Sequence, residues 1–177
     1  DLMSVAKQLS SAYQPISAAI IRGDIYDAMV EPSNKIGVFG HGYTYSCHPV
    51  AAAVALKTLE IYERDNIFGQ AAERGAYLME KLQVLSDHPI VGEIRGRGLM
   101  AAVELQNKET NQAYPMDVSD FMRRACQQEG LILRDVGTAI AFCPPLIITE
   151  AQIDEMVDMF VKALNATQAY IAQNRLA

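Results

Sequence analysis

The feature that most constrains this chain is a lone lysine between two short apolar runs near its start. Residues 2–6 are largely apolar, Lys7 follows them, and a small polar turn ends at Pro15 before a second apolar run at 16–21. Two apolar runs separated by turn residues are typical of short buried strands in an α/β sheet. We therefore expect Lys7 at the carboxyl end of a strand, where open α/β sheets place their ligands.

An amine in that position has a specific chemical use. Apolar neighbours disfavour the charged form of a lysine, and the neutral amine is the nucleophile that forms Schiff bases. The alternative is that Lys7 is simply exposed in the loop after a strand, since most lysines are solvated. The residues around Lys7 leave both interpretations open.

A second candidate site is the loop at residues 37–49. It combines glycines, tyrosines and a threonine with little periodicity, which is typical of a functional loop. Exposed backbone N–H groups and the Thr44 hydroxyl suit a phosphate, whereas the alternative is an ordinary glycine-rich connection. His41 and His48 flank the turn and are interpreted as structural, because two such histidines do not make a set of metal ligands.

Helices are expected on both sides of this loop. Asp24 is interpreted as the cap of a short helix that ends before a loop at 31–35. Pro49 suits the first turn of a helix that runs to about residue 64, and another helix runs from 67 to about 85. The buried face of the helix that starts at Pro49 is expected to carry Val50, Val54 and Ile61.

The remaining residues predict a small α+β domain after a turn at 86–89. A pair of strands is expected within 91–105, and Asp117 is expected to cap the next helix. Thr149 opens a capping box that starts the last helix, and the tail from residue 168 is expected to fray.

Two further strands are expected in this domain, at 131–134 and 139–143. Arg134 ends the first of them, and its planar guanidinium can bind both oxygens of a carboxylate. The alternative is a strand-end arginine in solvent, and Asp135 could pair with Arg134 and weaken its role. The glycine-flanked arginines at 95 and 97 could bind an anion or make structural contacts.

The composition excludes several classes of protein. A net charge of −6 without a basic cluster argues against nucleic-acid binding. The apolar runs are too short to span a bilayer, so we expect no membrane partner. Three scattered cysteines fit a reducing, cytoplasmic environment, and their spacing from the histidines suggests no metal site. These cysteines are Cys47, Cys126 and Cys143.

Four segments resemble the class III aminotransferases, which are fold-type I enzymes that use pyridoxal 5'-phosphate. They are the Lys7 region, GHGYTYSCHP at 40–49, RGRGLM at 95–100 with EL after it, and LRDVG at 133–137 with PPL after it. They occur in the family's order, and the match to the omega-amine and omega-amino-acid:pyruvate branch (the omega-transaminases) is closest. Each segment alone is a weak signal, but the combination is specific.

The resemblance implies an α/β fold, namely the C-terminal part of an aspartate aminotransferase-like large domain followed by a small α+β domain. Residues 1–48 would end the cofactor-binding large domain, 49–85 would be linking helices, and 86–177 would form the small C-terminal domain. Family members are more than twice this long, so the chain is expected to be a fragment. The family's glycine-rich phosphate turn, stacking aromatic residue and ring-nitrogen aspartate cannot be identified here.

The resemblance also implies roles for four residues. Lys7 would be the catalytic lysine that holds pyridoxal phosphate as a Schiff base. Thr44 would contact the cofactor phosphate of the neighbouring subunit, assisted by the backbone of Tyr43, which makes the protein a homodimer with a shared active site. Arg134 would be the mobile arginine that pairs with the substrate carboxylate and moves aside for amines that lack one.

Some residues depart from the family's pattern. Gln8 and Ser11 stand where many members have glycine. The branch therefore stays open between an omega-transaminase and a class III enzyme that acts on GABA, ornithine or a dialkylglycine, or is a racemase. A catalytically silent fragment that keeps the dimer surface is the alternative from a different functional class.

Overall fold

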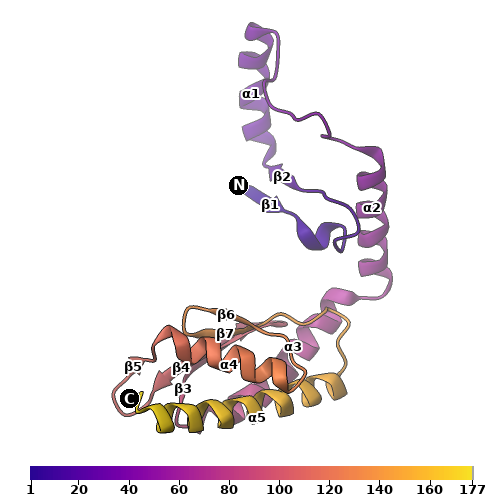
Figure 1. Ribbon diagram of the computed structural model, residues 1–177. Coiled ribbons are helices and arrows are strands. Elements are labelled where there is room, and N and C mark those ends of the chain that lie inside the picture. Colours follow the sequence, from indigo (N-terminus) through magenta and orange to yellow (C-terminus); the bar gives the residue numbers. More distant parts are fainter. Residues whose placement is uncertain (177) are drawn as a thin grey trace. The chain divides into compact units, whose positions relative to one another are not determined.

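The chain folds as two units in a computed structural model that describes residues 1–176 (Figure 1). The first unit is Asp1–Asn66, and the second starts at Ile67. Helix α2 (Pro49–Arg64) thus belongs to the first unit and helix α3 (Ile67–Gln83) to the second. The division into residues 1–48, 49–85 and 86–177 stays a prediction.

The first unit contains an antiparallel pair of strands. Strand β1 (Leu2–Val5) pairs with β2 (Ala18–Ile21) so that Leu2 lies opposite Ile21 and Val5 opposite Ala18. The predicted strand positions are confirmed, but their predicted burial is wrong, because three of the four residues in each strand are exposed. The residues of this unit place no layer over the faces of the pair.

Helix α1 (Gly23–Ile36) is longer than the sequence suggested, and the predicted loop at 31–35 is helical. An ion pair of 2.8 Å between Lys35 Nζ and Glu31 Oε1 spans its last turn. Gly37 ends it in the left-handed conformation with φ of 76°, and the N–H groups of Gly37 and Val38 bond to carbonyls of the last turn. Asp24 is not the cap: it lies in the first turn and accepts from Arg22.

Helix α2 buries a different face from the one predicted. Val50 is 53% exposed, whereas small residues one turn apart are buried together with Tyr62. Small side chains let the helix lie close to the turn that carries Lys7, so packing distance and not hydrophobicity selects this face. The buried residues are Ala51, Ala55, Thr58 and Tyr62.

The second unit is an antiparallel sheet packed with helices, as expected for a small α+β domain. Strand β4 lies between β3 and β7, β6 pairs with β7, and the short β5 pairs with β4. Helices α4 and α5 pack against each other (Figure 1). The elements are α3, the 3₁₀ turn η2 (Val84–Asp87), β3 (Val91–Arg97), β4 (Met100–Asn107), β5 (Gln112–Ala113), α4 (Met116–Gln128), β6 (Arg134–Val136), β7 (Ala139–Phe142) and α5 (Glu150–Asn174).

The core of this unit follows the alternation of its strands. Ala101, Val103 and Leu105 on β4 are buried, and Ile140 and Phe142 on β7 join them. The rings of Phe142 and Phe160 meet edge to face with centroids 4.9 Å apart. This core holds the β6–β7 hairpin at the edge of the sheet.

The helix ends of this unit partly follow the predictions. The capping box at Thr149 is confirmed, since the Thr149 hydroxyl accepts from the Gln152 N–H and the Gln152 side chain accepts from the Thr149 N–H. Asp117 is not a cap, because α4 begins at Met116. The tail predicted to fray from residue 168 is helical to Asn174, because Ile171 is buried; residue 177 lies outside the described residues.

Glycines bring α3 against the β3–β4 turn. A Cβ added to Gly75 would lie 2.2 Å from the carbonyl carbon of Gly98, and Gly98 itself has φ of +55°. A Cβ on Gly96 would lie 2.6 Å from the Met100 carbonyl oxygen. The glycines of the RGRG segment therefore allow close backbone approach.

Candidate active site

Lys7 lies in a strained turn. It opens the 3₁₀ turn η1 (Lys7–Leu9) and has a φ of 51°, in the left-handed region that favours glycine. Ser11 and Ala12 follow with φ of 48° and 62°. Non-glycine residues in this region cost about 1–3 kcal/mol each and cluster at functional sites. Ser11 thus adopts a glycine-like conformation at one of the positions where many family members have glycine.

Tyr62 of helix α2 holds this turn. Its hydroxyl donates to the Gln8 carbonyl oxygen at 2.9 Å and lies 2.8 Å from Ser11 Oγ. This role of Tyr62 was not predicted from the sequence. The helical spacing of Ala51, Ala55, Thr58 and Tyr62 is the pattern that indicates the buried face.

Lys7 lines an open cavity of about 1030 Å³ together with the loop at 37–49. Tyr43 and Ser46 from that loop and Ser10 from the lysine turn also line this cavity. Lys7 itself is exposed in this unit, which agrees with the alternative of a solvated lysine in the loop after a strand. The cause is the uncovered β1–β2 pair, which provides no apolar layer around the amine.

The loop between α1 and α2 has no helix or strand, as predicted. The Tyr43 N–H donates to Ser46 Oγ at 2.9 Å, and the Ser46 N–H donates back to the Tyr43 carbonyl. His41 and Tyr43 meet edge to face with ring centroids 6.0 Å apart, and Tyr45 and His48 do so at 6.3 Å. These ring contacts agree with structural histidines.

The predicted site residues of the first unit fall into two groups. Lys7 and Tyr43 line one cavity, whereas Thr44 is not among its lining residues. A threonine that serves a neighbouring subunit need not face its own chain's cavity. The roles of Lys7, Tyr43 and Thr44 stay predictions.

The chemistry of this cavity fits a phosphorylated aldehyde cofactor. Lys7 supplies an accessible amine, and the Ser46 hydroxyl and the Tyr43 N–H supply phosphate donors if their mutual bond exchanges for a ligand. A volume of about 1030 Å³ is ample for a ligand of that size. The residues that line this cavity are therefore compatible with such a cofactor.

Arg134 lies in the second unit, at the start of a strand and not at its end as predicted. Residues 131–133 are irregular, and Arg134 begins β6, paired with Ala141 of β7. Arg134 lines a groove of about 600 Å³ with apolar residues that include Ile132 and Met156. Within residues 1–176, its guanidinium makes no ion pair or side-chain hydrogen bond.

Asp135 does not pair with Arg134, contrary to the pairing considered from the sequence. Its Oδ1 lies 3.1 Å from Nε of Arg123 on helix α4. Adjacent residues of a strand point to opposite faces, so Arg134 and Asp135 diverge. The guanidinium of Arg134 is therefore free to bind a ligand carboxylate.

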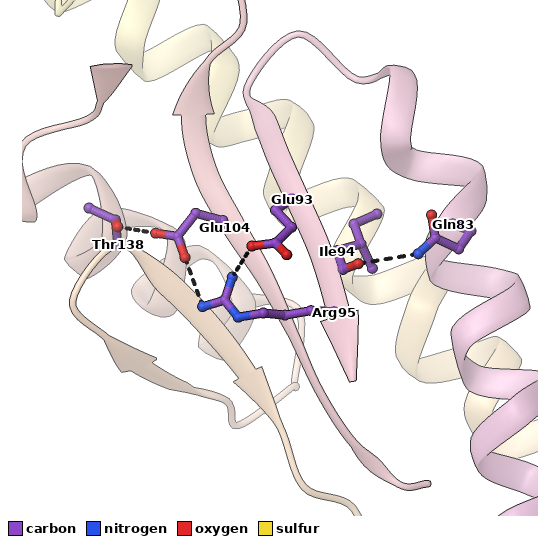
Figure 2. A network of polar contacts seen from close by, with 6 residues as sticks. All are labelled: Gln83, Glu93, Ile94, Arg95, Glu104 and Thr138. Atoms are coloured by element: carbon purple, nitrogen blue, oxygen red, sulfur yellow. Dashed lines mark hydrogen bonds and ion pairs between the residues drawn. The ribbon is translucent and has the colours of Figure 1, made fainter. Parts of the chain in front are cut away.

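Arg95 is occupied by structural contacts. It donates to Glu104 at 3.0 Å and to Glu93 at 2.9 Å (Figure 2). The hydrogen bond to Glu104 is the main cause of its raised pKa. These contacts favour the structural interpretation of Arg95 over anion binding.

Within the described residues, no helix is long and apolar enough to cross a membrane. Nor do residues 1–176 bring together three or more side chains able to hold a metal ion. The cavity of the first unit presents an amine, hydroxyls and backbone N–H groups, and the separate groove of the second unit presents the Arg134 guanidinium.

Comparison with known proteins identifies relatives along nearly the whole chain. The family model for aminotransferase class-III matches residues 1–164. Gamma aminobutyrate transaminase 1, mitochondrial, of Solanum lycopersicum is 39% identical over 176 residues, which are 98% of this chain and 34% of that protein. Gamma aminobutyrate transaminase 3, chloroplastic, of the same plant is 42% identical over 171 residues, 95% of this chain and 33% of that protein.

Solved structures give the same result. The omega transaminase from Pseudomonas jessenii in complex with PMP has a TM-score of 0.94 and 42% identity, covering 97% of this chain and 39% of that one. A transaminase solved with L-ala has a TM-score of 0.93 and 44% identity, covering 97% and 41%. These matches confirm the predicted fold class. The chain spans about a third of the length of the curated relatives it matches.

Proposed function

This chain belongs to the class-III aminotransferases, and on that premise we propose that the complete protein transfers an amino group from an amine or omega-amino acid to a keto acid such as pyruvate. The observation that carries the proposal is the strained turn that presents Lys7 to a cavity shared with the loop at 37–49. Class-III aminotransferases use pyridoxal 5'-phosphate, which serves as an electron sink when bound.

Lys7 would do two things in this reaction. Its Nζ would hold the cofactor in the resting enzyme as a Schiff base. When the substrate is bound, the freed Nζ would act as the general base and acid toward the substrate carbon that bears the amine. The left-handed turn, held by Tyr62, orients the amine for both roles.

The test of Lys7 is covalent trapping. The complete protein is incubated with pyridoxal phosphate and borohydride, and its peptides are mapped by mass. We expect a reduced adduct on Lys7 and none on Lys35, an exposed lysine already paired with Glu31. Lys7→Ala should abolish turnover, whereas Lys35→Ala should not change it. Near-normal turnover in Lys7→Ala, or a protein that takes up no cofactor, would refute the assignment and leave a catalytically silent module.

Arg134 would select carboxylate-bearing substrates. Its guanidinium, which has no ion-pair partner within residues 1–176, lines a groove whose other residues are mostly apolar but include Gln152 and Glu155. The apolar residues suit a short aliphatic chain, and the guanidinium suits its carboxylate. Replacing Arg134 by leucine should raise KM for an omega-amino acid about 10- to 100-fold, because the substrate carboxylate would lose its hydrogen-bonded charge partner. A simple alkyl amine should be little affected. Arg97→Leu is a matched control, because Arg97 is also exposed and has no ion-pair partner within residues 1–176. Equal losses on both substrates would contradict this role.

GABA is the second candidate for the amino donor. The two tomato relatives described above are GABA transaminases, whereas the solved neighbours include an omega transaminase, at similar identity. GABA is itself an omega-amino acid, so both readings require a carboxylate partner such as Arg134. Comparing kcat/KM for GABA, β-alanine and a carboxylate-free amine separates them.

We also propose a homodimer in which Thr44 serves the cofactor phosphate of the neighbouring subunit. Mixing an inactive Lys7→Ala protein with an impaired Thr44→Val protein should then restore activity. Random pairing gives about one quarter of wild-type activity, since half the dimers are mixed and each has one intact site. No recovery after subunit exchange would contradict a shared site. A cytoplasmic location is likewise proposed, testable by imaging a tagged full-length protein.

A further inference from the structure

We propose that two polar anchors on opposite sides of the β6–β7 hairpin position Arg134 for carboxylate binding. This inference rests on the function proposed above for Arg134. One anchor holds the turn of the hairpin to β4, and the other holds β6 to helix α4. Neither was found from the sequence.

The first anchor joins Thr138 to Glu104. The Thr138 hydroxyl donates to Glu104 Oε1, and the Leu105 N–H donates to the Thr138 carbonyl at 3.0 Å. The other carboxylate oxygen, Glu104 Oε2, accepts from Arg95 at 3.0 Å, and Arg95 also donates to Glu93 (Figure 2). Thr138 therefore binds a carboxylate that is itself held in place from β3.

The second anchor joins Asp135 to Arg123. Asp135 Oδ1 lies 3.1 Å from Arg123 Nε, and the two side chains are 29% and 30% exposed. Arg123 also pairs with Asp120 on its own helix, which limits the rotamers it can adopt. This partly buried contact fixes the α4-facing side of β6.

These anchors matter because the hairpin is short. Strand β6 has three residues, and the pairing with β7 runs only from Arg134 opposite Ala141 to Val136 opposite Ala139. Isolated hairpins are marginally stable, so side-chain contacts contribute much of their order. The anchors hold the backbone of Arg134 while its own guanidinium has no partner within residues 1–176. A side chain that binds one substrate class and moves aside for another needs an ordered backbone and a guanidinium that can change its position.

The experiment compares two neighbouring arginines in the complete holoenzyme. Arg123 and Arg124 both pair with Asp120, and of the two only Arg123 forms an ion pair with the hairpin within residues 1–176. Arg123→Gln is the test variant, and Arg124→Gln is its matched control. Each is measured in the first half-reaction with an omega-amino acid and with a carboxylate-free alkyl amine. Amide hydrogen exchange of residues 134–142 reports the order of the hairpin directly.

We expect Arg123→Gln to raise KM for the omega-amino acid about three- to fivefold, with kcat and the kinetics of the alkyl amine unchanged. Exchange at 134–142 should accelerate in this variant and not in Arg124→Gln. Thr138→Val, which removes the turn anchor without changing a charge, should reproduce the selective rise in KM. Arg123→Lys, which keeps the positive charge, should show a smaller rise in KM than Arg123→Gln.

Two results would overturn the inference. Equal losses on both substrates in Arg123→Gln and Thr138→Val would indicate a general structural effect. The anchors would be refuted if Arg123→Gln and Thr138→Val had the same KM values and exchange rates as Arg124→Gln. If Arg134→Leu still raised KM for the omega-amino acid selectively, the proposed function would stand. If Arg134→Leu itself shows no selective loss, the proposed role of Arg134 fails first.

Discussion

Replacing Tyr62 by phenylalanine should weaken cofactor binding although Tyr62 does not line the cavity. The substitution removes only the hydroxyl, which donates to the Gln8 carbonyl at 2.9 Å and lies 2.8 Å from Ser11 Oγ. Tyr62 is 8% exposed, so water cannot readily replace these contacts. The turn would lose the hydrogen bonds that offset its left-handed backbone at Lys7, Ser11 and Ala12.

The expected size follows from those contacts. Losing one or two partly buried hydrogen bonds costs about 1–2 kcal/mol, which corresponds to about 5- to 30-fold in an equilibrium constant. Because the proposed Schiff base with the cofactor forms on Lys7 within this turn, we expect the loss to appear in the dissociation constant of pyridoxal phosphate.

The assay is an absorbance titration of the complete apoprotein with pyridoxal phosphate. Tyr13→Phe is the matched control, because Tyr13 belongs to the same segment, is 82% exposed and makes no side-chain hydrogen bond within residues 1–176. A dissociation constant for Tyr62→Phe within twofold of wild type would refute the reasoning. An equal loss in Tyr13→Phe would do the same.

Two further predictions concern the second unit. Gly75→Ala should lower the free energy of unfolding by about 1–2 kcal/mol, since a Cβ only 2.2 Å from the Gly98 backbone outweighs the gain in helix propensity. Urea denaturation measures it, and Gly23→Ala, with nothing within 4 Å, should not destabilise the protein; an equally stable Gly75→Ala would contradict the close packing. Asp154 has a lowered pKa because Lys81, and secondarily Tyr77, donate hydrogen bonds to it. Its stabilising contribution is therefore complete above its ordinary pKa of 3.8 and is lost as pH falls through the lower folded value. Asp154→Asn should reduce the loss of stability that sets in as pH falls below this ordinary value, measured by urea midpoints, and an unchanged loss would contradict this.

The positions of strands and helices were predicted from the sequence better than the burial of the residues in them. The strands next to Lys7 and the capping box at Thr149 follow from local patterns, and local patterns persist in any context. Burial of the β1–β2 pair does not follow from local pattern, because it depends on what packs over the strands. The choice between a buried and an exposed Lys7 could not be made from the sequence for the same reason.

Helix α1 shows a different kind of failure. Glu31-Pro32-Ser33-Asn34 has the composition of a loop, yet the helix continues to Ile36. Pro32 removes one backbone donor, and the Schellman-type end at Gly37 with the Glu31–Lys35 ion pair still favours the helical last turn. Composition alone could not weigh those contacts against the proline.

The candidate site shows how one strand boundary changes a chemical conclusion. With a strand that ends at Arg134, Asp135 begins the following loop, and a loop residue can fold back onto its neighbour. With the strand beginning at Arg134, the period of two sends Asp135 toward Arg123 and leaves Arg134 on the opposite face. Arg134 then keeps a charge that a ligand can bind, whereas a pair with Asp135 would have neutralised it. Arg123 lies on α4, twelve positions before Asp135, so only the packing of that helix beside β6 could reveal that the Asp135 carboxylate already has a partner.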